Sequence, residues 1–338
     1  MRLDWPNTRI QTDLDFGARG RQVGDLRLRH SDDVVPLGYR PIPAAILSGA
    51  PGPTLLLAAG THGDEFEGPA ALMRLVHELD VERLKGRLVV LPALNAPAVS
   101  ESRRVSPLDG GNLNRSFPGD RDLGPTAQIA HFVERILLPH CDAAIDLHSG
   151  GKAAVFANCS LATRTADGAL FARNMALAEA FGAPFVWVLG RHNDDRSMNA
   201  AAARQGVPMI AAELSGAGAI DPGAEQLAHD GILRCMRHLG MLEEAPPASG
   251  RPRQFEIASA SQTLNAPCEG LFIRSFEPGD IVEAGAVAGV LRPLFEPERP
   301  PLRLLFPASG LVLCRTNRGL VKRGDMLATV VIECTGSA

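Results

Sequence analysis

The sequence has no long run of lysine and arginine, and its formal net charge is -4 over 338 residues. Proteins that hold nucleic acid or an anionic membrane through charge usually carry a basic patch or stripe. Because this sequence offers no such run, we expect neither nucleic acid nor a membrane as a partner.

Long apolar segments are also missing. No window approaches the roughly 18 consecutive apolar residues of a membrane span, and the first twenty residues, MRLDWPNTRIQTDLDFGARG, lack the apolar core of a signal peptide. We therefore expect no targeting segment, no membrane span and a cytoplasmic location.

Cysteine is sparse and never occurs as a C-x-x-C pair. The six cysteines lie far apart along the chain, at Cys141, Cys159, Cys235, Cys268, Cys314 and Cys334. This distribution argues against a zinc ribbon or a disulfide framework in a chain of this length. We expect mostly buried free thiols.

Hydrophobic residues make up 45% of the sequence, enough for a sizeable core, and the length allows two domains. Between about residues 40 and 240, short apolar runs alternate with longer segments in which apolar residues recur every three to four positions. The expected strands are PTLLLAAG (53–60), RLVVLPALN (87–95), CDAAIDLHS (141–149), APFVWVLG (183–190) and VPMIAAELS (207–215). The alternation predicts an α/β fold, a mostly parallel mixed sheet with helices on both faces.

We place a first domain at 1–242. Its first 40 residues or so could form an additional β segment. A Pro/Gly/charged linker at 243–254 follows, and 255–338 consists of strand-sized runs broken by Gly and Pro, which indicates a smaller all-β domain. Residues 266–291 align with 306–331 and resemble the two halves of a biotinyl/lipoyl-type barrel-sandwich fold. The segment between these halves, RPLFEPERPPLRLL, has no lysine for a swinging arm. We therefore expect a structural or oligomerising module rather than a carrier.

Polar residues that could bind a metal follow two of the predicted strands. In AAGTHGDEFEGPAAL (58–72), His62 and Glu65 are spaced to converge from one turn, and His148 ends the strand in AAIDLHSGG. Two imidazoles and a carboxylate, with a coordination position left for water, are typical of a catalytic zinc site. Asp146 points to the same face as His148 and could orient it.

A third strand end and two loops add groups suited to hydrolysis. Glu213 follows apolar residues in PMIAAELSGAG, so burial should raise its pKa and favour a role as general base. The Gly-rich loop GGNLNRSFPGD contributes Asn112, Asn114 and Arg115, which suit a substrate carboxylate. Either Arg103 or Arg104, just upstream, could polarise the carbonyl that is attacked.

In this order, GTHGDEFEGP, GGNLNRSFPGD, DLHSGG and AAELSGAG resemble the succinylglutamate desuccinylase/aspartoacylase family of the zinc carboxypeptidase-like superfamily. The resemblance covers roughly residues 45–338. It implies one zinc ion per chain on His62, Glu65 and His148, with Glu213 as the base that activates water. It also implies that Arg104 stabilises the oxyanion, and that Asn114 and Arg115 hold the α-carboxylate of the substrate.

The same motifs look most like the bacterial branch that deacetylates N-α-acetyl-L-2,4-diaminobutyrate. The second carboxylate-binding arginine of the family has no clear counterpart, and Arg196 in NDDRSMNAA is a weak candidate. Nearby, His192, Asp194 and Asp195 form a polar loop that either meets a substrate ammonium group or is a solvated turn.

The sequence thus predicts a zinc-dependent amidohydrolase that removes an acetyl or succinyl group from the α-nitrogen of an amino acid. The alternatives are a metallocarboxypeptidase acting on a peptide and a non-catalytic metal-binding scaffold. A β-domain that covers the site would favour a single acylated amino acid over a peptide. The acyl group, the side chain, the metal and the oligomeric state, including a homo-oligomer, stay open.

Overall fold

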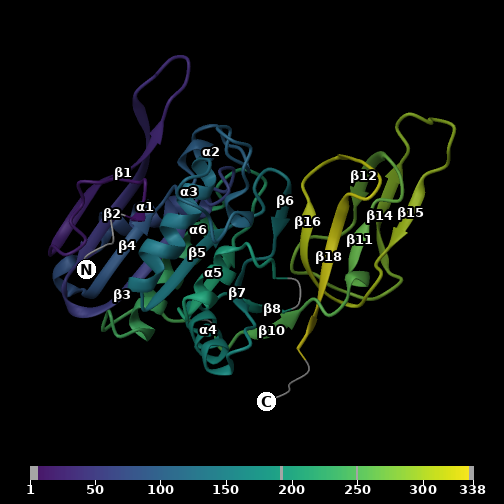
Figure 1. The fold of residues 1–338 in the computed structure, drawn as a ribbon. Helices are drawn as coiled ribbons and strands as arrows, with labels where there is room; N and C mark the ends of the chain where they lie inside the picture. Colours follow the sequence, from purple (N-terminus) through teal and green to yellow (C-terminus); the bar gives the residue numbers. More distant parts are fainter. Residues whose placement is uncertain (1–6, 191–192, 249, 335–338) are drawn as a thin grey trace.

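The computed structural model describes residues 7–190, 193–248 and 250–334, which form a larger body and a C-terminal lobe (Figure 1). The strands of the body are β1 Gly20–His30, β2 Gly38–Ser48, β3 Ala50–Ala59, β4 Lys85–Leu91, β5 Ala143–His148, β6 Ala154–Phe156, β7 Cys159–Thr163, β8 Phe185–Leu189 and β9 Met209–Glu213. The α-helices are α1 Glu67–Glu78, α2 Ala96–Ser100, α3 Pro125–His131, α4 Gly168–Phe181, α5 Met198–Arg204 and α6 Pro222–His238. Short turns of other helix types are η2 Val81–Arg83, η3 Leu113–Arg115, η4 Phe132–Leu137, η5 Leu138–His140 and η6 Ala260–Gln262.

Four parallel strands, β4, β3, β5 and β9, stand next to one another in the middle of the body. Leu55, Leu56 and Leu57 of β3 are all 0% exposed. Side chains alternate between the faces of a strand, so Leu55 and Leu57 enter one hydrophobic cluster and Leu56 enters the other. The apolar runs of the sequence therefore reflect strands that are buried on both faces.

Helices cover both faces of this sheet, as predicted. The helices α1, α4 and α6 supply the apolar side chains of one cluster, and α3, η4 and α5 supply those of the other. Among the described residues, no helix has both the length and the apolar composition that crossing a membrane requires.

The sheet as a whole is mixed, so the expectation of a mostly parallel sheet holds only for its centre. At one edge β1 and β2 form an antiparallel hairpin, and β2 pairs antiparallel with β4. On the other side β7 runs antiparallel to β9. The segment 125–140, which reads as one helix, is divided between α3, η4 and η5. β6 and β7 were not predicted, because neither contains an apolar run long enough to mark a buried strand.

The C-terminal lobe contains β10 Arg253–Glu256, β11 Thr263–Asn265, β12 Gly270–Arg274, β13 Ile281–Val282, β14 Val287–Arg292, β15 Leu302–Leu305, β16 Gly310–Thr316, β17 Leu320–Val321 and β18 Met326–Glu333. A separate antiparallel sheet has the order β15-β14-β12-β17. The other strands of the lobe extend the large sheet through β8-β10-β18-β16. The lobe is therefore joined to the body by strand pairing as well as by the chain that connects them.

The internal repeat is visible in the strand pairing. β13 of the first half pairs with β16, and β17 of the second half pairs with β12. Gly270 and Gly310 begin the equivalent strands β12 and β16. A Cβ atom at these positions would lie 2.4 Å from the Arg292 carbonyl oxygen and 2.2 Å from that of Val331. Both glycines are thus required by a close approach between neighbouring strands.

The six cysteines are free, four of them buried and two partly exposed. This agrees with the expectation of mostly buried free thiols.

Candidate metal centre

The polar groups of the site lie at the carboxyl ends of three adjacent parallel strands, β3, β5 and β9. His62 follows the end of β3, His148 is the last residue of β5, and Glu213 is the last residue of β9. His148 and Glu213 are direct partners in the strand register. Because these strands end at one edge of the sheet, residues far apart in the sequence meet there.

His62, Glu65 and His148 converge on one point. The Nδ1 atoms of His62 and His148 lie 2.8 Å and 2.9 Å from the two carboxylate oxygens of Glu65. The three ligand atoms lie within 4.8 Å of one another, and the residues are only 3%, 2% and 6% exposed.

The charges of this group suit a cation. Burial alone would raise the pKa of Glu65, but the two imidazoles oppose it and hold that pKa below its ordinary value. Burial lowers the pKa of His62, which favours the neutral imidazole that can bind a metal. Two imidazole nitrogens and a carboxylate at this spacing therefore fit a divalent metal ion of the zinc type.

A second layer of hydrogen bonds orients His148. Asp146, 1% exposed, lies 2.8 Å from the Nε2 atom of His148 and accepts a hydrogen bond of 3.0 Å from the hydroxyl of Thr61. Burial acts to lower the pKa of His148, but the carboxylates of Asp146 and Glu65 outweigh it and raise that pKa, so without a metal both ring nitrogens donate to carboxylates. When Asp146 keeps the proton on Nε2, Nδ1 is the nitrogen that a metal ion would bind. The predicted orienting role of Asp146 agrees with this contact. Thr61 was not singled out in the sequence, although it directly precedes His62.

Glu213 lies beside this group with one carboxylate oxygen, Oε2, buried and without a hydrogen-bond partner among the described residues. Burial raises its pKa to about 8, although the nearby charges of His148 and Arg104 oppose the shift. A carboxyl group whose pKa is raised in this way is suited to exchange protons near neutral pH.

Arg104, rather than Arg103, reaches the metal group, by which we mean the three candidate ligands His62, Glu65 and His148. Its Nη1 atom lies 3.4 Å from Glu65 Oε1, and about half of its side chain is exposed, so it lies at the mouth of the site. Arg103 instead points to Glu101, at 3.4 Å. The geometry therefore favours Arg104 as the group that faces a reacting carbonyl.

The residues predicted to bind the substrate form a second cluster. Asn114 Oδ1 accepts a hydrogen bond of 2.9 Å from the backbone N–H of Met198, the first residue of α5. Arg115 and Arg196 both contact the carboxylate of Asp194, at 3.1 Å and 2.9 Å. α5 leads into β9, so its N-terminus lies at the sheet edge where β9 ends, the edge of the metal group.

Asn112 lies just before η3, and its Oδ1 atom is buried with no hydrogen-bond partner among the described residues. Asp195 is exposed, whereas His192 lies outside the described residues.

The C-terminal lobe reaches the site through β6, which stands between the body and the lobe in Figure 1. β6 pairs with β16, and on its other side Phe156 and Ala154 exchange hydrogen bonds of 2.9 Å and 3.0 Å with Ser215 and Ala217. These two residues have φ values of 53° and 65°. They belong to the loop that directly follows Glu213, so the lobe helps to fix a strained segment next to the predicted base.

Lys152 is a further residue that the sequence did not reveal. Its backbone N–H donates to Asp64 Oδ2 at 2.9 Å, and its ammonium group donates to the carbonyl of Ser102 at 2.7 Å. Its own carbonyl accepts a hydrogen bond of 3.3 Å from Asn317 of the lobe. Lys152 thus joins the metal-site loop, the loop of Arg104 and the C-terminal lobe.

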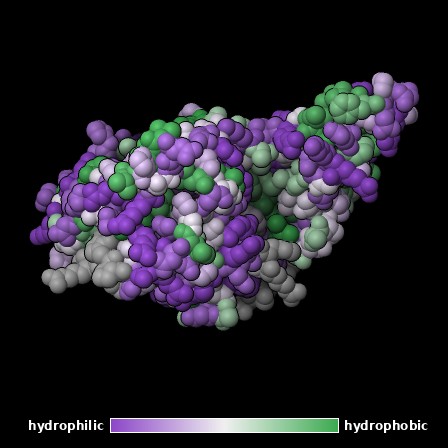
Figure 2. All heavy atoms as spheres, turned by 45° about the horizontal axis from the view of Figure 1, so that its top comes forward, coloured by the Kyte–Doolittle hydropathy of each residue, from purple (hydrophilic) through white to green (hydrophobic). Residues whose placement is uncertain are grey.

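Figure 2 shows a hollow where the body and the lobe meet.

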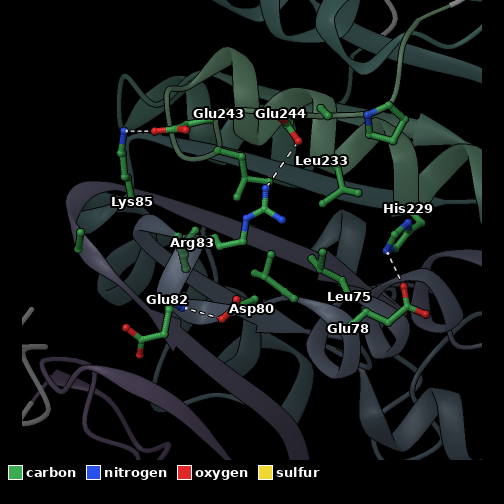
Figure 3. Close-up of a pocket in the computed structure, with 16 residues that line it drawn as sticks. Leu75, Glu78, Asp80, Glu82, Arg83, Lys85, His229, Leu233, Glu243 and Glu244 are labelled. Carbon is green, nitrogen blue, oxygen red and sulfur yellow. Dashed lines mark hydrogen bonds and ion pairs between the residues drawn. The ribbon is translucent and has the colours of Figure 1, made fainter.

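A cavity of about 640 Å³ lies elsewhere, between the C-terminal part of α1, η2, the start of β4 and α6 (Figure 3). None of the predicted site residues is among the described residues that line it. Several of its charged groups already face one another, with Lys85 3.2 Å from Glu243 and Arg83 3.7 Å from Glu244. Since β4 begins there, the cavity lies at the opposite edge of the parallel strands from the metal group, and we assign it no part in the chemistry.

Comparison with known proteins identifies the family. Residues 51–239 match the model of the succinylglutamate desuccinylase/aspartoacylase catalytic domain. An N-alpha-acetyl-L-2,4-diaminobutyric acid deacetylase of Halomonas elongata is 33% identical over 330 residues, which are 97% of this chain and 96% of that protein.

Two solved structures are similar over nearly the whole chain. A succinylglutamate desuccinylase/aspartoacylase of Rhodobacter sphaeroides has a TM-score of 0.91 at 34% identity, over 96% of this chain and 100% of its own. The product-bound ectoine utilization protein EutE (DoeB) of Ruegeria pomeroyi has the same TM-score and identity, over 96% of this chain and 98% of its own. The resemblance read from the sequence motifs is thereby confirmed, and the chain belongs to the succinylglutamate desuccinylase/aspartoacylase family of hydrolases.

Proposed function

We propose that the chain is a zinc-dependent amidohydrolase that removes a small acyl group, acetyl or succinyl, from the α-nitrogen of an amino acid. The observation that carries the proposal is the convergence of His62, Glu65 and His148 at one strand edge, with Glu213 on the next strand. A metal group beside a carboxyl group of raised pKa is the arrangement that amide hydrolysis by water requires.

His62, Glu65 and His148 would hold the zinc ion, one per chain. When bound, zinc supplies a Lewis acid that lowers the pKa of water and polarises an amide carbonyl. Glu213 would accept a proton from the attacking water and return it to the departing amine. Arg104 would neutralise the negative charge that develops on the carbonyl oxygen.

The cluster around η3 would orient the substrate. Arg115 presents a guanidinium group suited to the α-carboxylate, and Asn114, with its Oδ1 atom held by the backbone of Met198, would direct its amide toward the same group. We propose an accessory contact for Asn112, whose buried Oδ1 atom lies at the start of the same turn. Arg196 is a weaker candidate, because Asp194 already occupies its guanidinium group through two hydrogen bonds.

Two observations reduce the range of substrates that the site is expected to accept. The pairing of β6 with β16 and with the loop after Glu213 brings the C-terminal lobe to the site, which supports a single acylated amino acid over a peptide. The relative from Halomonas elongata is a deacetylase of N-α-acetyl-2,4-diaminobutyrate and is similar over nearly its full length. We therefore propose this compound, or a close basic analogue, as the substrate.

The finer points of organisation belong to the same proposal. We place the catalytic domain at 1–242, the linker at 243–254 and the β-domain at 255–338, with a barrel-sandwich arrangement of the β-domain. A cytoplasmic location fits a role in amino-acid metabolism. A homo-oligomer is compatible with this organisation.

The test combines metal content with amine release from a panel of N-acetyl and N-succinyl amino acids. The wild type is compared with Glu213→Gln, which keeps the size of the side chain but removes the base, and with Glu82→Gln on the opposite edge of the sheet as a control. We expect about one metal per chain in all three proteins and a loss of kcat of about 10²- to 10⁴-fold in Glu213→Gln alone.

The outcomes separate the alternatives. Stoichiometric metal without amine release from any acyl amino acid would overturn the deacylase proposal, and cleavage of peptides would then support the carboxypeptidase alternative. Metal without either activity would support a scaffold. Full activity in Glu213→Gln would refute the role of that residue.

A further inference from the structure

Asp194 holds an unusual position between two arginines. Its carboxylate receives two hydrogen bonds from the Arg196 guanidinium, at 3.0 Å and 2.9 Å, and lies 3.1 Å from the Nε atom of Arg115. The backbone N–H of Arg196 donates a further hydrogen bond of 2.9 Å to the same carboxylate. Asp194 is therefore held in a defined place beside the arginine proposed to bind the substrate carboxylate.

The carboxylate of Asp194 stays ionised in this environment. Hydrogen bonds from the side chain and backbone of Arg196, together with the charge of Arg115, hold the pKa of Asp194 well below its ordinary value. Its side chain is 25% exposed, so an arriving ligand can reach it. A fixed and accessible negative charge is thus present next to Arg115.

Binding of a carboxylate by Arg115 weakens this pair. Arg115 faces Asp194 through Nε and donates to the Asn114 carbonyl through Nη1, so a substrate carboxylate shares the guanidinium charge with Asp194 and leaves Asp194 held mainly by Arg196. Loss of a charged partner from a partly buried site is costly unless another cation replaces it. A substrate that carries an ammonium group a few bonds from its carboxylate brings that cation with it.

We propose that Asp194 is a specificity-determining residue that receives the ammonium group on the substrate side chain. The inference rests on the proposed deacylase function and adds the residue that would select N-acyl amino acids with a short basic side chain. The ion pair between Arg115 and Asp194 is exchanged for two ion pairs with the ligand: Arg115 pairs with the substrate carboxylate, and Asp194 pairs with the substrate ammonium group. No charge is then left without a partner. An acidic side chain would instead face Asp194 and be repelled.

The hydrogen bonds between the guanidinium group of Arg196 and Asp194 agree with a site for a substrate ammonium group. A deacylase for a substrate with a second carboxylate needs a second free cation near the first. Arg196, the other arginine on Asp194, is bound to that carboxylate through two hydrogen bonds, so its guanidinium group is not free for a second substrate carboxylate. The cluster is therefore arranged for a carboxylate and an ammonium group rather than for two carboxylates.

The test is the kinetics of three N-acetyl amino acids of similar size. N-acetyl-2,4-diaminobutyrate has a side-chain ammonium group, N-acetylnorvaline has a methyl group in its place, and N-acetylglutamate has a carboxylate. Asp194→Asn removes the charge with little change of shape, Asp194→Glu keeps it, and Asp195→Asn removes the adjacent carboxylate as a matched control. Thermal unfolding shows whether each variant is folded.

We expect the wild type to prefer the diaminobutyrate compound over N-acetylnorvaline by about 10- to 100-fold in kcat/KM, as for a charge-assisted hydrogen bond. In Asp194→Asn this ratio should fall to within about threefold, through a higher KM for the basic substrate. The kcat for N-acetylnorvaline should change little. Asp194→Glu and Asp195→Asn should keep the preference.

Two results with Asp194→Asn would overturn the inference while leaving the proposed function intact. One is an unchanged substrate ratio in Asp194→Asn. The other is an equal loss for all three substrates, which would mean that Asp194 only positions Arg115. If Asp194→Asn does not fold, a loss of preference in Asp195→Asn or a full preference for N-acetylglutamate in the wild type would still refute it. A wild type that cleaves none of the three compounds would overturn the proposed function itself, and the inference with it.

Discussion

Replacement of Asp146 by Asn tests whether the second layer of hydrogen bonds sets the metal affinity. Asp146 contacts the Nε2 atom of His148 and accepts a hydrogen bond from Thr61, and both Asp146 and Thr61 are almost completely buried. The amide of Asn is nearly the same size but carries no charge. It can also direct its NH₂ group at Nε2, which would place the imidazole proton on Nδ1 and block the ligand position.

The expected magnitude follows from these contacts. Loss of a carboxylate partner behind a metal-binding histidine usually weakens metal affinity about 10- to 100-fold. One tenfold step corresponds to about 1.4 kcal/mol, so the change is about 1.4 to 2.7 kcal/mol. The hydrogen bond from Thr61 can be kept by the Asn carbonyl, so the free energy of unfolding of the metal-free protein should change by less than this.

The assay is competition for zinc between the protein and a chromophoric chelator, with Thr61→Val as the control. Thr61→Val removes the hydroxyl that binds Asp146 but leaves the carboxylate on His148, so we expect only a small change in affinity. Equal zinc affinity in the wild type and in Asp146→Asn would refute the reasoning, because it would show that Asp146 does not determine which nitrogen of His148 carries the proton. A loss as large in Thr61→Val would point to a general loosening of the core.

Two further predictions concern the framework of the site. Lys152→Met removes the hydrogen bond to Ser102 that holds the loop of Arg104 in place, so kcat should fall about 3- to 10-fold while the zinc affinity stays unchanged. Lys152→Arg should recover part of this loss. An unchanged kcat of Lys152→Met in steady-state kinetics would contradict the prediction. Gly231→Ala places a methyl group 2.6 Å from the ring of Phe181, where α6 packs on α4, so the free energy of unfolding measured in urea should fall by about 1 to 3 kcal/mol. Gly168→Ala, whose new methyl group meets no atom within 4 Å, should leave the free energy of unfolding unchanged or raise it slightly.

The centre of the fold was predictable because each of its strands is an uninterrupted apolar run. Leu55 to Ala59 are buried on both faces of the sheet, and such burial leaves an unmistakable pattern in the sequence. The polar residue that ends such a run, such as His148 or Glu213, is conspicuous because burying it requires a partner. The candidate ligands and the candidate base could therefore be named from the sequence.

The loops around the centre could not be predicted in the same way. The contact of Asp194 with Arg115 joins residues 79 positions apart through two irregular segments, and neither segment has a periodic pattern. Likewise, β6 has only three residues, all of them partly exposed, so nothing in AVF marks it as a strand. Its pairing depends on β16, about 160 residues later. Contacts of this kind arise from tertiary structure and leave little local signal.

The C-terminal lobe supports the framework of the candidate site. Ser215 and Ala217 have left-handed backbone conformations, each of which costs on the order of 1–2 kcal/mol for a residue with a side chain. Hydrogen bonds from Gly150 and Phe156 to the carbonyl of Ser215 offset this cost. A three-residue strand cannot supply such support alone, because an isolated short strand is unstable in water. The pairing of β6 with β16 therefore stabilises the loop that begins at Glu213, and the position of the proposed base depends on a lobe that contributes none of the proposed metal ligands.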